Sequence, residues 1–259
     1  MKNKFAAIIF LILAVSMVFP QPALAEDEDF SEHLEKGIEY SKNENYDSAL
    51  NELEEAVKLN PKSSSANEEL CCVYVVLAGK QTNAIQRRAY FKKAEYYANK
   101  AMEILPNTVI CRLLGALTCF FGRYDQSIAY YKKSMQISPS ITDYNGIAEA
   151  YYYLDKYDRS IEYYTRSIAA EPDDIDAYFG IGRCYRQMKE YQQAMDYLHK
   201  VLHMNPNHAQ ALYNLGQVYY ATNRYPEARE YFLRARDIFK KQNSVYFTKK
   251  VDEYLRKIE

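Results

Sequence analysis

Residues 209–239 read AQALYNLGQVYYATNRYPEAREYFLRARDIF, and this stretch decides the fold because its pattern returns along the chain. Its regularly placed small residues include Gly216, Ala228 and Ala235, and its regularly placed aromatic residues include Tyr219 and Tyr225. Equivalent residues recur about every 34 positions, and self-similarity at a fixed period of this length indicates a repeat architecture.

Prolines mark the period of the repeat. Five of them follow one another at intervals of 45, 33, 33 and 34 residues, namely Pro61, Pro106, Pro139, Pro172 and Pro206. Proline ends helices because it lacks a backbone N–H and disfavours helix in the preceding residue. With proline at position 32 of a 34-residue repeat, six repeats are predicted near residues 30–63, 64–107, 108–140, 141–174, 175–208 and 209–242.

Small and large side chains keep their places in this register. Position 8 is small in every repeat: Gly37, Cys71, Gly115, Ala148, Gly182 and Gly216. Glycine inside a helix costs about 0.5–1 kcal/mol relative to alanine, so close approach of a second helix must offset it. Positions 20 and 27 are also mostly small, which predicts two tightly packed antiparallel helices per repeat. Aromatic residues recur at position 11 (Tyr40, Tyr74, Tyr151, Tyr185 and Tyr219) and at position 17 in all six repeats, and we expect them to fill the space between pairs.

These positions resemble the tetratricopeptide repeat family over about residues 30–242. The resemblance implies an all-α, right-handed superhelical solenoid of about six helix pairs. An extra 11 residues in the second repeat correspond to about three helical turns, so a long second helix is expected over about 83–105. Residues 243–259, with apolar side chains at helical spacing, are predicted to form a C-terminal capping helix, because a terminal repeat needs a polar outer face.

The first 25 residues resemble a bacterial secretory signal peptide. Lys2 and Lys4 precede an uncharged apolar run from Phe5 to Phe19, and Ala23 and Ala25 stand where signal peptidases require small residues. The protein is therefore expected to be exported to the periplasm or the extracellular space, with no stable membrane insertion after cleavage. The alternative is an uncleaved N-terminal anchor that holds residues 26–242 and the cap outside the membrane.

Composition and side-chain chemistry argue against several classes of function. The chain carries 33 Lys and Arg against 34 Asp and Glu, whereas nucleic-acid binders have a strong basic excess. No phosphate-binding loop, nucleophile elbow or paired Cys-x-x-Cys occurs, so no catalytic residue, cofactor or metal is assigned. His199 and His203 have metal-ligand spacing but fall on the expected outer surface of a second helix, and the five cysteines are expected to serve packing.

The family resemblance also implies a binding surface. In tetratricopeptide arrays the first helices line a concave groove that binds a peptide segment of another protein. Carried onto this sequence, the groove residues are Arg112, Phe120, Asn145, Glu149, Tyr152, Phe179, Arg183, Arg186, Tyr213, Gln217 and Tyr220. The residues by which some family members clamp the C-terminal carboxylate of chaperones are absent. The implied function is a non-catalytic scaffold or adaptor for other proteins.

A different function is suggested by the two ends of the chain. Residues 26–63 carry twelve acidic side chains against four basic ones, whereas residues 209–259 carry ten basic side chains against six acidic ones. Opposite charges at the ends can orient a partner or favour self-association between copies. The alternative function is therefore an accessory of cell-envelope assembly or secretion that acts as a structural oligomer.

Overall fold

The computed structural model describes residues 28–258, and these residues are all-α. The predicted signal peptide at 1–25 lies outside the described residues. Among the described residues, thirteen helices pack as sequential antiparallel pairs followed by a single C-terminal helix, which confirms the predicted fold class. None of these helices combines the length and the apolar character needed to cross a membrane.

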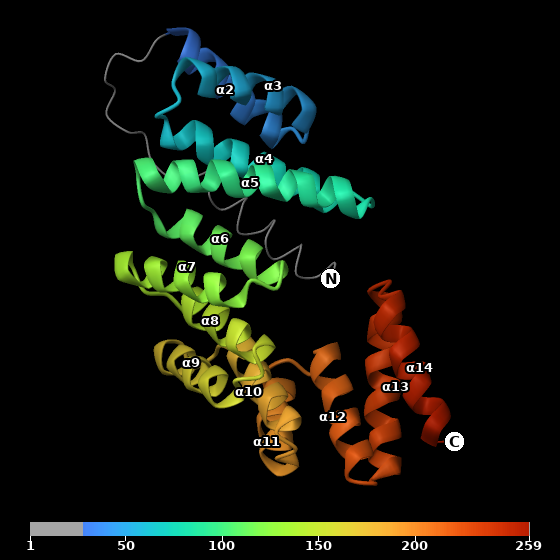
Figure 1. Cartoon of the computed structure of the whole chain (residues 1–259). Coiled ribbons are helices and arrows are strands. Elements are labelled where there is room, and N and C mark those ends of the chain that lie inside the picture. The colour runs from blue at the N-terminus through green and yellow to red at the C-terminus, as the bar shows by residue number, and fades with distance from the viewer. Residues whose placement is uncertain (1–27, 259) are drawn as a thin grey trace. The chain divides into compact units, whose positions relative to one another are not determined.

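The chain divides into two compact bodies, residues up to Pro139 and residues from Ser140. The N-terminal body holds α2 (Glu28–Lys42), α3 (Tyr46–Leu59), α4 (Ser64–Lys80), α5 (Ala84–Ile104), α6 (Thr108–Phe120) and α7 (Tyr124–Ile137). The C-terminal body holds α8 (Ile141–Tyr153), α9 (Tyr157–Ala170), α10 (Ile175–Gln187), α11 (Tyr191–Met204), α12 (Ala209–Ala221), α13 (Tyr225–Lys241) and α14 (Val245–Ile258) (Figure 1).

The small residues of the repeat lie where the two helices of a pair touch. A Cβ added to Gly216 on α12 would lie 2.6 Å from the ring of Phe232 on α13, and Gly115 faces Tyr131 in the same way at 2.8 Å. The large residue at position 24 therefore fills the space left by position 8. The small residue at position 20 contacts the backbone at position 8. In the third repeat, the Ser127 hydroxyl donates to the Gly115 carbonyl at 2.8 Å.

The turn inside five of the six pairs, all but that of the second repeat, has a left-handed residue at position 15. It is Gly122 in the third repeat, with φ 74°, but Glu44, Asp155, Lys189 and Asn223 elsewhere, with φ between 57° and 63°. This conformation costs about 1–2 kcal/mol for a residue with a Cβ. Only one of the five residues is glycine, so this conformation was not predicted from the sequence.

Neighbouring repeats meet through positions 3, 6 and 10 of the first helix. In the fifth repeat these are Ala177, Gly180 and Cys184, all buried. Gly180 abuts the ring of Tyr164 on α9, and the Cys184 thiol contacts the Ser160 hydroxyl of α9 at 3.3 Å. In the sixth repeat the same positions are buried as well. This face of each first helix is therefore the surface that receives the preceding repeat.

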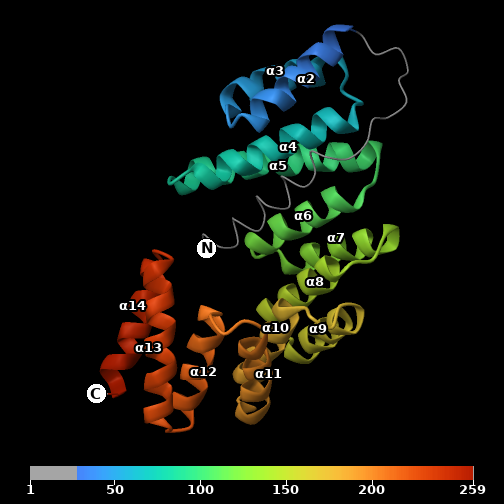
Figure 2. The ribbon, with the colours of Figure 1, turned by 180° about the vertical axis from the view of Figure 1, so that it is seen from behind.

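The extra residues of the second repeat lengthen both of its helices. α4 has 17 residues against 13 in α6, and α5 has 21 against 14 in α7. Figures 1 and 2 show α4 and α5 running side by side, with their joined ends extending beyond α6. The insertion thus extends a hairpin whose tip lies at 81–83.

The aromatic positions are less uniformly buried than expected. Tyr74 is buried, with its hydroxyl 2.5 Å from a Glu54 carboxylate oxygen. Tyr40 and Tyr225, however, are 37% and 43% exposed, so the expectation that they fill space between pairs is wrong for them. Tyr40 belongs to the first repeat, which has no preceding repeat among the described residues, and Tyr225 begins the last second helix, α13.

Candidate protein-binding surface

The expected groove residues divide between the two bodies. Arg112 and Phe120 lie on α6 in the N-terminal body, and the other nine lie on α8, α10 and α12 in the C-terminal body. The Arg112 guanidinium donates to the Ser138 carbonyl at 3.2 Å, and the Phe120 ring packs 5.5 Å from that of Phe91. The nine residues on neighbouring first helices of the C-terminal body therefore form the candidate surface, here called the α8–α10–α12 face.

Arg183 joins α10 to α8 on this face. Its guanidinium lies 4.0 Å from the centroid of the Tyr152 ring and 5.6 Å from that of Phe179, which are cation–π distances. Gln187, one turn further along α10, donates to the Tyr152 hydroxyl at 3.2 Å. Burial lowers the pKa of Arg183, but the opposing effect of Tyr152, Tyr164 and Glu149 is larger. The pKa is therefore raised above its ordinary value, and the guanidinium stays charged.

Asn145 has a structural role between the same helices. Its amide nitrogen donates to Asp174 Oδ2 at 2.8 Å. Asp174 also accepts from the Ser167 hydroxyl at 2.7 Å and caps α10 through the Ala177 amide at 3.1 Å. An aspartate at an N-cap accepts a hydrogen bond from a free helix N–H, and its negative charge interacts favourably with the positive end of the helix dipole. Asn145 thus holds the start of α10 against α8, and Glu149, one turn later, is half-buried beside the Tyr153 hydroxyl at 3.4 Å.

Arg186 continues the surface from α10 to α12. Its Nε donates to Asn214 Oδ1 at 2.8 Å, and the Asn214 amide donates to the Gln210 carbonyl at 2.7 Å. Phe179 packs against the ring of His208, the N-cap of α12, at 4.9 Å. Among the described residues, neither Arg183 nor Arg186 forms an ion pair with a carboxylate. Neither guanidinium is therefore in direct contact with a carboxylate, although Glu149 acts electrostatically on Arg183.

The face ends at a pocket between α12 and α14. Gln217 donates from its amide nitrogen to the hydroxyls of Tyr213 and Tyr254, both at 3.1 Å, and the Tyr220 ring lies 5.4 Å from that of Tyr254. The pocket measures about 390 Å³ and is lined by Tyr213, Gln217, Tyr246, Phe247, Lys250, Glu253, Tyr254 and Lys257. Burial raises the pKa of Tyr213 to about 12, so its hydroxyl stays neutral.

The part of this pocket that α14 supplies was not predicted from the sequence. Residues 243–259 were expected to form a cap alone, whereas Tyr246, Lys250 and Lys257 line the pocket. The repeat spacing could have predicted their place, because α14 occupies the position of the first helix of a seventh repeat. Tyr246 is 67% exposed, which is unusual for a large aromatic side chain that serves packing only.

The other candidate chemistry is not assembled into a site. In residues 28–258, no three His, Cys, Asp or Glu side chains are grouped so as to hold a metal ion. His203 is exposed, and His199 contacts the Tyr219 hydroxyl at 3.4 Å. None of the five cysteines, all within the described residues, is in a disulfide, and all but Cys119 are buried. Burial raises the pKa of the Cys184 thiol to about 11, which keeps it protonated and unreactive.

Several solved structures share this fold. PilW, described as a widely conserved type IV pilus biogenesis factor, is 19% identical with a TM-score of 0.68, covering 87% of this chain and 99% of PilW. PilF of Pseudomonas aeruginosa is 15% identical with a TM-score of 0.63, covering 88% of this chain and 99% of that chain. YrrB, described as a TPR protein with an unusual peptide-binding site, is 17% identical with a TM-score of 0.52, covering 78% and 97%.

Sequence comparison gives the same family. No curated protein matches the chain significantly. Family models described as tetratricopeptide repeat match residues 34–96 and 145–202, residues 120–141, and residues 186–248. Together these matches span well over half of the chain, and they agree with the paired helices and with the register of small and aromatic residues. The chain therefore belongs to the tetratricopeptide repeat family.

Proposed function

We propose that this protein is a non-catalytic scaffold or adaptor that binds an extended segment of a partner protein along the α8–α10–α12 face. One observation carries the proposal: two arginines lie one turn apart on α10, and neither forms an ion pair with a carboxylate among the described residues. The Arg183 guanidinium lies over the Tyr152 ring, and Arg186 donates to Asn214. Arginine and tyrosine, like tryptophan, are enriched at energetic hot spots of protein interfaces. Tetratricopeptide proteins are generally protein-interaction modules, and the description of YrrB names a peptide-binding site.

The pocket supplies an anchor at one end of this surface. Its aromatic walls suit a planar or apolar side chain, and the Gln217 amide and the tyrosine hydroxyls offer hydrogen bonds to a peptide backbone. The face and the pocket share α12, so one extended segment could contact both.

The test compares partner binding by the protein and by two variants. Partners are captured from native envelope and culture-supernatant fractions and identified by mass spectrometry. The binding segment of each partner is then mapped, and calorimetry with the synthetic segment measures its affinity. Arg183→Glu/Arg186→Glu should weaken binding at least about tenfold, because it replaces two hot-spot cations by anions. Tyr246→Ala/Lys257→Glu tests the pocket separately.

A matched control has the same change in net charge. Lys92→Glu/Lys132→Glu alters two exposed lysines on α5 and α7 of the N-terminal body. This variant should bind like the unaltered protein, and circular dichroism should show that all three variants are folded. Equal affinity for the unaltered protein and the arginine variant would place binding elsewhere on the molecule.

We also propose that the protein acts outside the cytoplasm, on the strength of the residues 1–25 pattern. The description of PilW as a pilus biogenesis factor favours the second candidate role, an accessory of envelope assembly or secretion. Alkaline phosphatase fused after residue 259 should be active only when residues 1–25 are present. Intact residues 1–25 on the purified protein, shown by N-terminal sequencing, would instead favour a membrane anchor.

A further inference from the structure

The first helix of the array, α2, has acidic side chains at the positions that are buried in the first helices of later repeats. Positions 3, 6 and 10 of the first repeat are Glu32, Glu35 and Glu39 on α2, and all three are exposed. Glu32 pairs with Lys36 of the same helix, whereas neither Glu35 nor Glu39 forms an ion pair within residues 28–258. α2 therefore presents an inter-repeat packing face that is anionic and uncovered by any described element.

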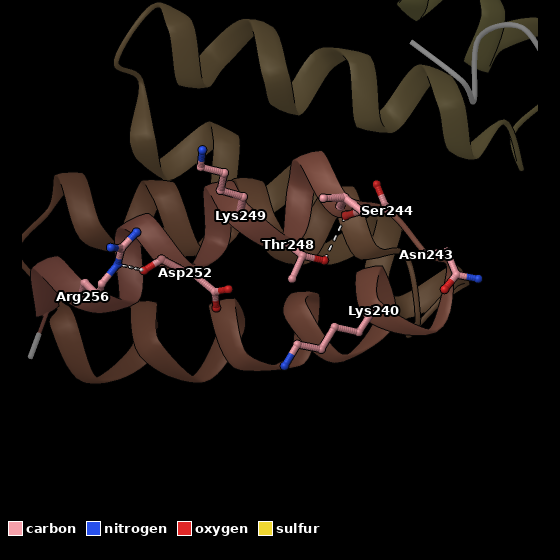
Figure 3. A pocket seen from close by; sticks show the side chains of 8 residues that line it. Lys240, Asn243, Ser244, Thr248, Lys249, Asp252 and Arg256 are labelled. Atoms are coloured by element: carbon pink, nitrogen blue, oxygen red, sulfur yellow. Dashed lines mark hydrogen bonds between the residues drawn. The ribbon is translucent and has the colours of Figure 1, made fainter.

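The last helix presents a basic counterpart. α14 buries Val251 and Leu255 and turns Lys249 and Arg256 outward. Figure 3 shows these two side chains on α14 and Lys240 at the end of α13. All three are among the residues that line a pocket of about 600 Å³. The acid within it, Asp252, lies 3.6 Å from Arg236, so its charge is already compensated.

Within residues 28–258, no helix covers the outward face of α14. Every other first helix in the described chain pairs with the second helix that follows it, but α14 packs on α13 and no second helix follows it up to residue 258. Its outward face, with Lys249, Asp252 and Arg256 one and two turns apart, stands where such a helix would pack. The pocket in Figure 3 lies along that open side.

We propose that copies of this protein associate head to tail, with the acidic face of α2 of one copy on the basic face of α13 and α14 of the next. Charge complementarity selects the occupant: residues 28–63 carry ten acidic side chains against four basic ones, and residues 240–258 carry six basic against two acidic. Each association leaves one face of each kind free, so the contact is heterologous and extends into a ring or a filament. This self-association is independent of peptide binding on the α8–α10–α12 face.

Reversing the charge of either face provides the test. Sedimentation velocity of the purified protein at low salt should show assemblies that grow with concentration and dissociate as salt rises. Glu35→Lys/Glu39→Lys and Lys249→Glu/Arg256→Glu should each stay monomeric, with association weakened by about tenfold or more because two attractive contacts become repulsive.

Mixing the two variants makes the test specific. Each mixed contact then joins an acidic face to a basic face, so the mixture should assemble although neither component does. One chain carrying all four substitutions should assemble by itself, and Lys92→Glu/Lys132→Glu should behave like the unaltered protein. A monomer at every concentration and salt, or assemblies that persist in the single-face variants, would overturn the proposal.

Discussion

The guanidinium of Arg183 lies 4.0 Å from the centroid of the Tyr152 ring, so that α10 and α8 are joined by a cation and an aromatic face. Tyr152 is 9% exposed, and Gln187 holds its hydroxyl from the same side. The contact therefore contributes to stability as well as to the surface proposed to bind a partner.

A double-mutant cycle should measure this contact. Arg183→Met and Tyr152→Leu should each destabilise the protein, and the two effects should be non-additive by about 1 kcal/mol, the size of a partly desolvated cation–π pair. Urea unfolding of the four proteins gives the coupling free energy. Tyr152→Phe keeps the ring and should preserve most of the coupling, whereas strict additivity would show that the contact contributes nothing.

Gly180→Ala should destabilise the C-terminal body. The new Cβ would lie 2.2 Å from the Tyr164 ring, so α9 and α10 would have to separate, at a cost of roughly 1–3 kcal/mol for an overpacked core. Thermal unfolding checks the effect. Tyr164→Leu alone should leave a cavity, but combined with Gly180→Ala it should cost less than the sum of the two. An unchanged melting temperature for Gly180→Ala would contradict this packing.

Lys189→Gly should stabilise the protein. Lys189 has φ 63° in the turn between α10 and α11, where glycine lacks the steric penalty of a Cβ. We expect a gain of about 0.5–1 kcal/mol in the free energy of unfolding, measured by urea titration. Gly122→Ala, at φ 74° in the equivalent turn, should have the opposite sign, so equal signs for the two substitutions would rule out the explanation.

Glu69 should make stability decrease between pH 4.5 and pH 7. Burial, aided by the neighbouring Glu68, raises its pKa from 4.5 to about 7. The folded state then binds the proton more tightly than the unfolded state, so its contribution is greatest below pH 4.5 and is lost as pH rises to about 7. The loss can reach about 3 kcal/mol. Glu69→Gln should flatten this part of a pH series of urea unfolding curves, and an unchanged slope would show that Glu69 ionises normally.

Sequence reasoning predicted the fold well because the repeat is a matter of spacing. Pro61, Pro139 and Pro206 each stand two residues after the end of a helix, at Leu59, Ile137 and Met204. Regular helices need only local signals, and the return of each signal in five or six repeats removes its ambiguity.

The candidate site was less predictable, because it depends on contacts between repeats. The sequence placed Arg183 and Tyr152 on one surface, but not the guanidinium over the ring. Asn145 was expected to be a groove residue, whereas its amide nitrogen donates a hydrogen bond to Asp174. Tyr246 and Lys257 were not predicted as pocket residues. The proline pattern stops before α14, because Lys240 occupies the position at which the earlier repeats have proline.

The lengthened hairpin of α4 and α5 provides a place to alter the chain without disturbing the repeats. Its extra turns lie at the joined ends of the two helices, so additions at 81–83 leave the contacts with α3 and α6 in register. The chain contains no tryptophan, and Ile85 beside this tip is 81% exposed. Ile85→Trp would therefore give the protein a single tryptophan as a fluorescent reporter. A labelling tag inserted at the same tip would leave both charged ends and the α8–α10–α12 face unmodified.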